Sequence, residues 1–178
     1  MNRKHFLALI PAAALLTPFK SNAALADIAQ AKSKIPPYLT DGDTIGITCP
    51  AGYITAEEIE AAVIQIKSWG FNVVIGKTVG ARDFTFGGTD EERLQDLQEM
   101  LDDPTINAIM CARGGYGAVR ILDQLNFRGY KSSPKWIIGF SDVTVLHSHL
   151  NRMGIESIHG TMPVSIARAT DEAKNSLC

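Results

Sequence analysis

Short apolar runs alternate with amphipathic helical patterns through most of this sequence, and that alternation restricts the folds the chain can adopt. Strands are predicted at residues 44–49, 71–76, 107–112, 135–140 and 156–160, and helices at 55–69, 89–103, 118–125 and 143–153. Apolar strands joined through helices form a parallel sheet with helices on both faces, because each parallel connection needs a crossover. We therefore predict an α/β fold with a mostly parallel, Rossmann-like sheet flanked by helices.

The first two predicted helices carry recognisable start signals. Thr55 is the expected N-cap of the first, Glu58 three residues later completes a capping box, and Gly70 ends the helix. The second helix is expected to begin at Thr89 or Asp90.

The amino-terminal residues have the layout of a secretory signal peptide. Arg3 and Lys4 precede an apolar stretch from Phe6 to Phe19, and small residues follow up to Ala23. The stretch is short for a membrane span of about 20 residues. We predict an exported, periplasmic protein with no stable membrane insertion after cleavage. The expected boundaries are a signal peptide at 1–23, a leader segment at 24–40, an α/β domain at 41–165 and the start of an interdomain segment at 166–178.

The net charge and the cysteine spacing limit the kinds of partner and metal site that the chain is expected to have. A formal net charge of -2 over 178 residues gives no electrostatic basis for binding nucleic acid or an anionic membrane. Cys49, Cys111 and Cys178 lack metal-ligand spacing, so no metal site is predicted. An oxidising compartment would permit a disulfide between Cys49 and Cys111, although two buried thiols are the favoured interpretation.

Three segments that follow predicted strands carry the candidate chemistry. They are Cys49 to Gly52, Arg113 to Gly117, and Ser141 to Asp142. In an open α/β sheet, ligands bind in the crevice outside the carboxyl ends of the strands. The sequence therefore predicts that these three segments share one crevice.

Ser141 lies in a strand-to-helix turn, as the nucleophile of an elbow does. The turn has the leading Gly139 of a G-x-S-x-G elbow and lacks the trailing glycine. The competing interpretation therefore makes Ser141 or Asp142 a helix N-cap. The glycine-rich "ARGGYG" turn offers backbone amides that would stabilise an oxyanion together with the amide of Asp142. The same turn lacks the lysine of a P-loop and the full dinucleotide spacing, which disfavours nucleotide binding.

Four segments in register, "GDTIGITCPAG", "ARGGYGAVRILDQLNF", "KWIIGFSDVTVLHSHL" and "IHGTMP", resemble the N-terminal half of the LD-carboxypeptidase family of serine peptidases. That family includes murein tetrapeptide carboxypeptidases and microcin-C self-immunity peptidases, and the resemblance covers about residues 36 to 177. It implies a layout like that of class I glutamine amidotransferases. It also implies that Ser141 is the nucleophile, with oxyanion donors at the amides of Gly115 and Asp142. Arg113, Gly114 and Tyr116 are then expected to contact substrate, although Arg113 equally suits a structural ion pair.

The resemblance further implies the reaction and its partners. Family members hydrolyse the bond between an L-configured centre, typically of diaminopimelate, and a terminal D-alanine in peptidoglycan peptides, without metal or cofactor. Their serine works with a glutamate and a histidine from a second, C-terminal domain, which these 178 residues do not contain. We therefore expect the isolated chain to be inactive, with a murein peptide as the substrate and a homodimer as a possible state.

Other interpretations remain open at this stage. His147, His149 and His159 are interpreted as structural, because the first two lie one and a half to two helical turns beyond Ser141. The alternative function is a non-catalytic periplasmic binding domain or an inactive fragment. An amidotransferase-like hydrolase with Cys111 as nucleophile is disfavoured, since Cys111 lies within a predicted strand.

Overall fold

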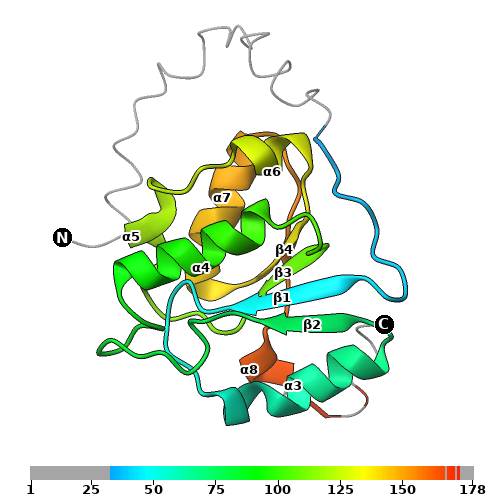
Figure 1. Ribbon diagram of the computed structural model, residues 1–178, viewed down its shortest axis with the longest axis vertical. Coiled ribbons are helices and arrows are strands. Elements are labelled where there is room, and N and C mark those ends of the chain that lie inside the picture. The colour runs from blue at the N-terminus through cyan, green and yellow to red at the C-terminus, as the bar shows by residue number, and fades with distance from the viewer. Residues whose placement is uncertain (1–32, 167, 171, 173–178) are drawn as a thin grey trace, which may run out of the picture. The chain divides into compact units, whose positions relative to one another are not determined.

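The computed structural model describes residues 33–166, 168–170 and 172. Its strands form a five-stranded sheet in the order β2-β1-β3-β4-β5 (Figure 1). Every neighbouring pair of strands is parallel, so the predicted fold class is confirmed. The strands are β1 (Thr44–Thr48), β2 (Asn72–Ile75), β3 (Ala108–Cys111), β4 (Trp136–Gly139) and β5 (Ile158–His159). The helices are α3 (Ala56–Ser68), α4 (Asp90–Asp102), α5 (Ala118–Leu122), α6 (Arg128–Ser132), α7 (Thr144–Arg152) and α8 (Pro163–Ile166), with a 3-10 turn η3 (Ser141–Val143).

The strand order reverses at β1. The chain passes from β1 to β2 on one side and then crosses to β3 on the other side of β1. Such a reversal separates the loops that follow β1 and β3, and it leaves a crevice at the carboxyl ends of those two strands. The topology therefore places the candidate segments after β1 and β3 at the switch point of the sheet.

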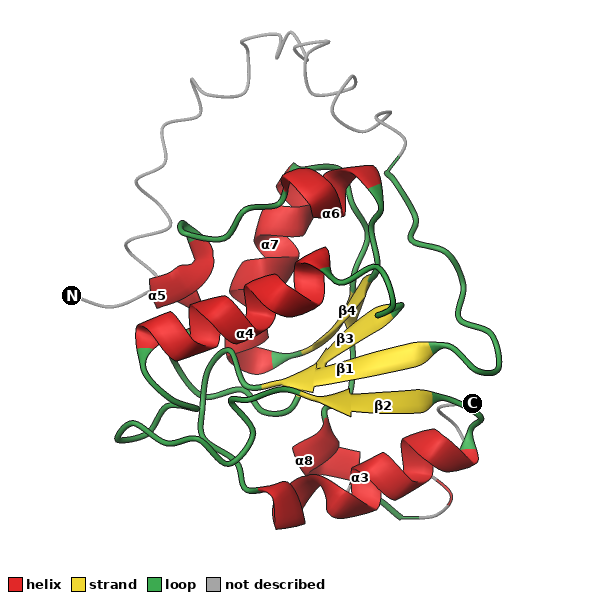
Figure 2. Ribbon diagram, in the orientation of Figure 1, coloured by secondary structure: helices red, strands yellow, loops and turns green. Residues whose placement is uncertain are grey.

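Helices cover both faces of the sheet (Figure 2). One face packs against α4, α5, α6 and α7, and the other packs against α3 and α8. Along β3, Ile109 and Cys111 belong to the first core, whereas Ala108 and Met110 belong to the second. This alternation explains why the strand is apolar at every position, because each of its faces is buried.

Two capping boxes start the long helices where the sequence predicts them. The Thr55 side chain accepts from the Glu58 amide at 3.2 Å, and Glu58 accepts from the Thr55 amide at 2.9 Å. Thr89 and Glu92 repeat the arrangement at the start of α4, so Thr89 is the N-cap of that helix. Gly70 follows the C-cap of α3 with φ of 91°, a left-handed conformation that glycine adopts readily.

A buried carboxylate joins α4 to the ends of β1 and β2. Asp96 is 3% exposed and accepts from the hydroxyls of Thr48 at 2.6 Å and Thr78 at 2.5 Å. It also accepts from the Lys77 amide at 2.8 Å. A buried charge is tolerated when its oxygens are hydrogen-bonded in this way, so Asp96 fixes the loop that follows β2.

The described part of the predicted leader segment packs against the sheet. Lys34 forms a parallel bridge with Ile155, and the Trp136 indole donates to the Pro37 carbonyl at 2.8 Å. The predicted signal peptide at 1–23 and the residues from 173 onward lie outside the described residues. Among the helices of the described ranges, none combines the length and the apolar character that crossing a membrane requires.

Candidate active site

Ser141 occupies a sharp turn between β4 and α7. Phe140 is fully extended, with φ of -149° and ψ of -173°, and Ser141 then has φ of 63°. A side-chain-bearing residue rarely adopts this left-handed conformation, and such strain often accompanies functional sites. The bend leaves Ser141 exposed at the carboxyl end of β4, as the elbow interpretation requires.

Ser141 does not act as a helix N-cap. The N-cap of η3 is Phe140 and that of α7 is Val143, and neither makes a side-chain capping bond. Within the described residues, the Ser141 hydroxyl also forms no hydrogen bond. The N-cap interpretation of Ser141 is therefore wrong, and its hydroxyl is not occupied by a structural contact.

The glycine-rich turn after β3 lies directly against the Ser141 side chain. A Cβ on Gly114 would lie 2.8 Å from the Ser141 Cβ and 3.1 Å from its Oγ. Only a glycine permits so close an approach of the backbone to the hydroxyl. The next residue, Gly115, has φ of 112°, so the turn uses a conformation that glycine tolerates best.

The segment after β1 is hydrogen-bonded to the glycine-rich turn. The Gly52 amide donates to the Gly114 carbonyl at 2.9 Å, and a Cβ on Gly115 would lie 3.4 Å from the Gly52 Cα. The ends of β1 and β3 are therefore bonded together at the switch point, with Ser141 from β4 beside them. The structure thus brings together the three segments that the sequence assigned to one crevice.

The two expected oxyanion donors, the amides of Gly115 and Asp142, belong to residues next to this contact in the chain. Gly115 follows the glycine that touches Ser141, and Asp142 follows Ser141 itself. The Asp142 amide lies in the first turn of a helical segment, where N–H groups have no intrahelical partner. The Asp142 carboxylate, in contrast, is engaged, because it accepts from the Ala118 amide at 2.8 Å.

Arg113 and Tyr116 lie exposed at the rim of this turn. Arg113 Nη1 donates to the Tyr53 carbonyl at 3.1 Å, and no ion pair of Arg113 occurs among the described residues. The part of the chain that the structure describes therefore gives no support to the ion-pair interpretation of Arg113. The Tyr116 side chain is 57% exposed, and its ring lies 6.2 Å from that of Phe86.

Arg93 is a structural element of the site that the sequence analysis missed. It is fully buried, and its Nη1 donates to the carbonyls of Pro50 at 2.7 Å and Gly117 at 2.9 Å. Its Nη2 pairs with Asp90. Burial lowers the pKa of Arg93, and the neighbouring Asp90 opposes that shift. A signal existed in the sequence, since Arg93 precedes the buried Leu97 by one helical turn.

The predicted structural role of the helix histidines is confirmed. His147 Nε2 lies 2.9 Å from the Gly139 carbonyl, and its Nδ1 lies 2.8 Å from the Ser157 hydroxyl. Because a carbonyl only accepts, Nε2 carries the proton. Burial lowers the pKa of His147. His149 stacks on Phe127 with ring centroids 4.9 Å apart.

His159 lies beside the ring of Phe140, the residue before Ser141. It ends β5, where it is exposed, and its ring centroid lies 6.2 Å from that of Phe140. The structure records no hydrogen bond between His159 and Ser141 among the described residues. Its contacts are with the aromatic ring of Phe140 and with the ring of His147 at 5.9 Å.

Cys49 and Cys111 are buried free thiols, as the favoured interpretation predicts. They belong to cores on opposite faces of the sheet, which separates their side chains. Burial raises the pKa of Cys49 to about 12 and also raises the pKa of Cys111. A nucleophilic cysteine needs an accessible thiolate, so the interpretation of Cys111 as nucleophile is not supported. In the described ranges, no group of three or more His, Cys, Asp or Glu side chains is arranged to hold a metal ion.

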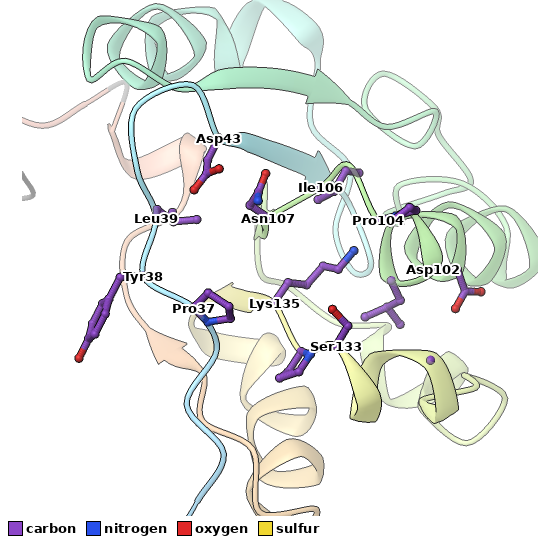
Figure 3. Close-up of a pocket in the computed structure, with 13 residues that line it drawn as sticks. Pro37, Tyr38, Leu39, Asp43, Asp102, Pro104, Ile106, Asn107, Ser133 and Lys135 are labelled. Carbon is purple, nitrogen blue, oxygen red and sulfur yellow. The ribbon is translucent and has the colours of Figure 1, made fainter.

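A cavity of about 200 Å³ lies at the amino ends of the strands, opposite the end that carries Ser141 (Figure 3). Its lining includes Asp43, Asn107 and Lys135, which immediately precede β1, β3 and β4. The buried Lys135 ammonium donates to the carbonyls of Met100 at 3.0 Å and Asp103 at 2.5 Å, near the end of α4. Since the strands are parallel, this cavity is separated from Ser141 by the length of the sheet.

Similarity to known proteins agrees with the geometry of the crevice. Residues 45–160 match the LD-carboxypeptidase N-terminal domain. The murein tetrapeptide carboxypeptidase of Pseudomonas aeruginosa is 37% identical over 141 residues, which cover 75% of this chain and 46% of that protein. The solved structure of the microcin C7 self-immunity protein MccF with aspartyl sulfamoyl adenosine has a TM-score of 0.75 at 28% identity, over 80% of this chain and 45% of that chain.

A second solved structure is the muramoyltetrapeptide carboxypeptidase from Oxalobacter formigenes. It has a TM-score of 0.61 at 31% identity and covers 67% of this chain and 40% of that chain. The chain spans about half the length of the curated relatives it matches. The matched domain includes the ends of β1, β3 and β4, and the chain belongs to the LD-carboxypeptidase family.

Proposed function

We propose that this protein contributes the nucleophile of a serine-type LD-carboxypeptidase that acts on peptidoglycan peptides. The observation that carries the proposal is the left-handed Ser141, whose exposed hydroxyl faces Gly114 at the switch point of the sheet. The name of the Pseudomonas aeruginosa relative, a murein tetrapeptide carboxypeptidase, supports the substrate class. A peptidoglycan substrate also agrees with the proposed export to the periplasm.

In the proposed reaction, the Ser141 oxygen attacks the carbonyl carbon of the bond between diaminopimelate and the terminal D-alanine. As the new C–O bond forms, an electron pair moves to the carbonyl oxygen, which the amides of Gly115 and Asp142 stabilise. The C–N bond then breaks, and D-alanine leaves after its amine takes up the proton lost by the serine. Water hydrolyses the resulting ester and restores the hydroxyl.

The serine proton needs a general base. The family resemblance assigns this role to a histidine and a glutamate of the C-terminal half. Within the described residues, no histidine or carboxylate is hydrogen-bonded to Ser141. Since loss of such partners typically lowers kcat by about 10⁴–10⁶, we propose that residues 1–178 alone turn over substrate very slowly.

The exposed rim suits the end of a peptide chain. A carboxypeptidase has to recognise a terminal carboxylate, and the guanidinium of Arg113 is a geometric match for one. Arg113 is exposed and uses Nη1 for the Tyr53 carbonyl, while Tyr116 presents a half-exposed ring beside it. We therefore assign Arg113, Gly114 and Tyr116 to substrate binding.

A fluorophosphonate probe tests the assignment of the nucleophile. The 178-residue chain and its Ser141→Ala variant are treated with the probe, and the modified peptide is identified by mass spectrometry. We expect one adduct at Ser141 that the variant lacks. Release of D-alanine from a murein tetrapeptide, and its loss on Ser141→Ala, is measured on a form of the protein that includes the C-terminal half. Adducts elsewhere, or equal labelling of the variant, would refute the serine mechanism.

The second candidate function is a peptide-binding domain without catalysis. It is favoured by the lack of a base hydrogen-bonded to Ser141 in the described part of the chain. Calorimetric titration with a murein tetrapeptide distinguishes the two candidates. Binding without any Ser141 adduct or D-alanine release, in a form that also contains the C-terminal half, would favour the binding domain.

A further inference from the structure

A single peptide unit beside the crevice is held from both sides by opposite charges. The Gly117 carbonyl accepts from Arg93 Nη1 at 2.9 Å, and the Ala118 amide donates to the Asp142 carboxylate at 2.8 Å. These two groups belong to the same planar peptide, so the two bonds together fix the rotation of its plane. Hydrogen bonds to charged groups are stronger than those between neutral groups.

The Arg93 side of this peptide is rigid. Arg93 is fully buried, and the same Nη1 also donates to the Pro50 carbonyl at 2.7 Å in the segment after β1. Its Nε donates to the Gly88 carbonyl at 3.2 Å. A Cβ on Gly117 would lie 2.7 Å from Nη1, and Gly117 has φ of 135°, so a side chain is excluded there on both counts.

The Asp142 side joins this peptide to the serine turn. Asp142 is the residue after Ser141, and its carboxylate reaches the first amide of α5, whose N-cap Gly117 has no side chain to cap the helix. The Arg113–Gly117 turn is thus fixed at both ends. At one end the Gly52 amide holds the Gly114 carbonyl, and at the other end Arg93 and Asp142 hold the Gly117–Ala118 peptide.

We infer that Arg93 and Asp142 are positioning residues that hold the Gly117–Ala118 peptide in one orientation and so keep the Arg113–Gly117 turn beside Ser141. The effect on catalysis rests on the proposed function, because it assumes that amides of this turn stabilise the oxyanion. The Asp142 side chain then has a role distinct from that of its backbone amide. Substitution of the side chain removes its hydrogen bond to Ala118 and leaves the backbone amide of residue 142 in place.

The experiment uses the full 178-residue chain and compares Asp142→Ala with Asp142→Asn. The concentration dependence of fluorophosphonate labelling separates the maximal rate from the apparent affinity. We expect the maximal rate of Asp142→Ala to fall by about 10²-fold, as for a misplacement of about 1 Å, with the affinity unchanged. Asp142→Asn should retain most of the rate, because its amide oxygen still accepts from Ala118.

Asp43→Asn is the matched control. The Asp43 carboxylate also accepts from a backbone amide, that of Thr40, at 2.8 Å, and it lies at the amino ends of the strands. Its labelling rate should equal that of the wild type. Arg93→Lys should lower the maximal rate as well, since a single ammonium does not reproduce the guanidinium fork. If circular dichroism shows that Arg93→Lys is unfolded, the Asp142 variants alone test the positioning role.

Backbone NMR supplies a readout that is independent of the chemistry. The Ala118 amide proton should move upfield in Asp142→Ala and less in Asp142→Asn, while Asp43→Asn leaves it unchanged. An unaffected Ala118 resonance would overturn the inference that Asp142 holds this peptide. A shifted resonance with wild-type labelling would overturn the positioning role. If wild-type Ser141 is not labelled at all, its hydroxyl is not activated without the general base of the C-terminal half, and the NMR result alone decides whether Arg93 and Asp142 fix this peptide.

Discussion

The contact between Gly114 and Ser141 makes Gly114→Ala the sharpest test of the site. The new Cβ would lie 2.8 Å from the Ser141 Cβ, 3.1 Å from its Oγ and 3.4 Å from the Phe140 carbonyl. Ordinary contacts between carbon atoms are about 3.5–4.0 Å, so the serine has to move by about 1 Å. No positive φ is recorded for Gly114, so backbone strain does not complicate the substitution.

The expected effects differ for activity and stability. A displacement of about 1 Å typically lowers a rate by about 10²-fold, so labelling of Ser141 by a fluorophosphonate should slow by that factor. Overpacking by one methyl group should reduce the free energy of unfolding by about 1–3 kcal/mol, which leaves a folded protein in urea titrations. Gly114→Ala should therefore be folded and nearly unreactive.

Gly129→Ala is the matched control for this prediction. Gly129 is exposed in α6, and its added Cβ would meet only Asp102 Oδ1 at 3.4 Å, an ordinary contact distance. Labelling of Ser141 should be unchanged, and stability should rise by up to about 1 kcal/mol because alanine restricts the unfolded chain. Wild-type labelling in a folded Gly114→Ala protein would refute the claim that the hydroxyl is held against this turn.

Three further predictions follow from the same geometry. Ser141→Gly should abolish labelling yet raise stability by about 1 kcal/mol, because glycine relieves the left-handed conformation; a lower midpoint in urea would contradict the strain. Burial lowers the pKa of His147, so its contribution to stability is complete above its ordinary pKa of about 6.5 and is lost as the pH falls toward the lowered value. In urea titrations at several pH values, His147→Gln should therefore weaken the dependence of the free energy of unfolding on pH. An unchanged pH dependence would be evidence against this role. Peptide mapping after treatment with a thiol reagent at pH 8 should find Cys49 and Cys111 modified only in the unfolded protein, because burial raises both pKa values.

Much of the fold was predictable because its signals are local. Strands buried on both faces are apolar throughout, and the two long helices begin at capping boxes. The short helices α6 and α8 were not predicted, since five and four residues are too few to establish a helical period. Ser141 was found despite the missing trailing glycine, because a serine between an apolar strand and a helix already indicates an elbow.

The parts that could not be predicted involve buried charges that bond to distant backbone. Arg93 donates to carbonyls after β1 and β3, Asp96 accepts from an amide after β2, and Lys135 donates to carbonyls near the end of α4. Each of these partners lies 19 to 43 residues away in sequence, and none is itself a charged side chain. A single sequence gives the helix face of such a residue, yet it does not give the loop that its side chain will reach.

The inferred positioning role means that the site relies on charged side chains that do not touch substrate in the proposed mechanism. The groups that face Ser141 are backbone groups of glycines, which have no side chains through which packing can fix their orientation. Their positions must therefore be set by neighbours that bond to the backbone itself, and a charged group does so more strongly than a neutral one. Arg93 and Asp142 meet that requirement from opposite sides of one peptide, which couples the geometry of the glycine turn to that of the serine turn.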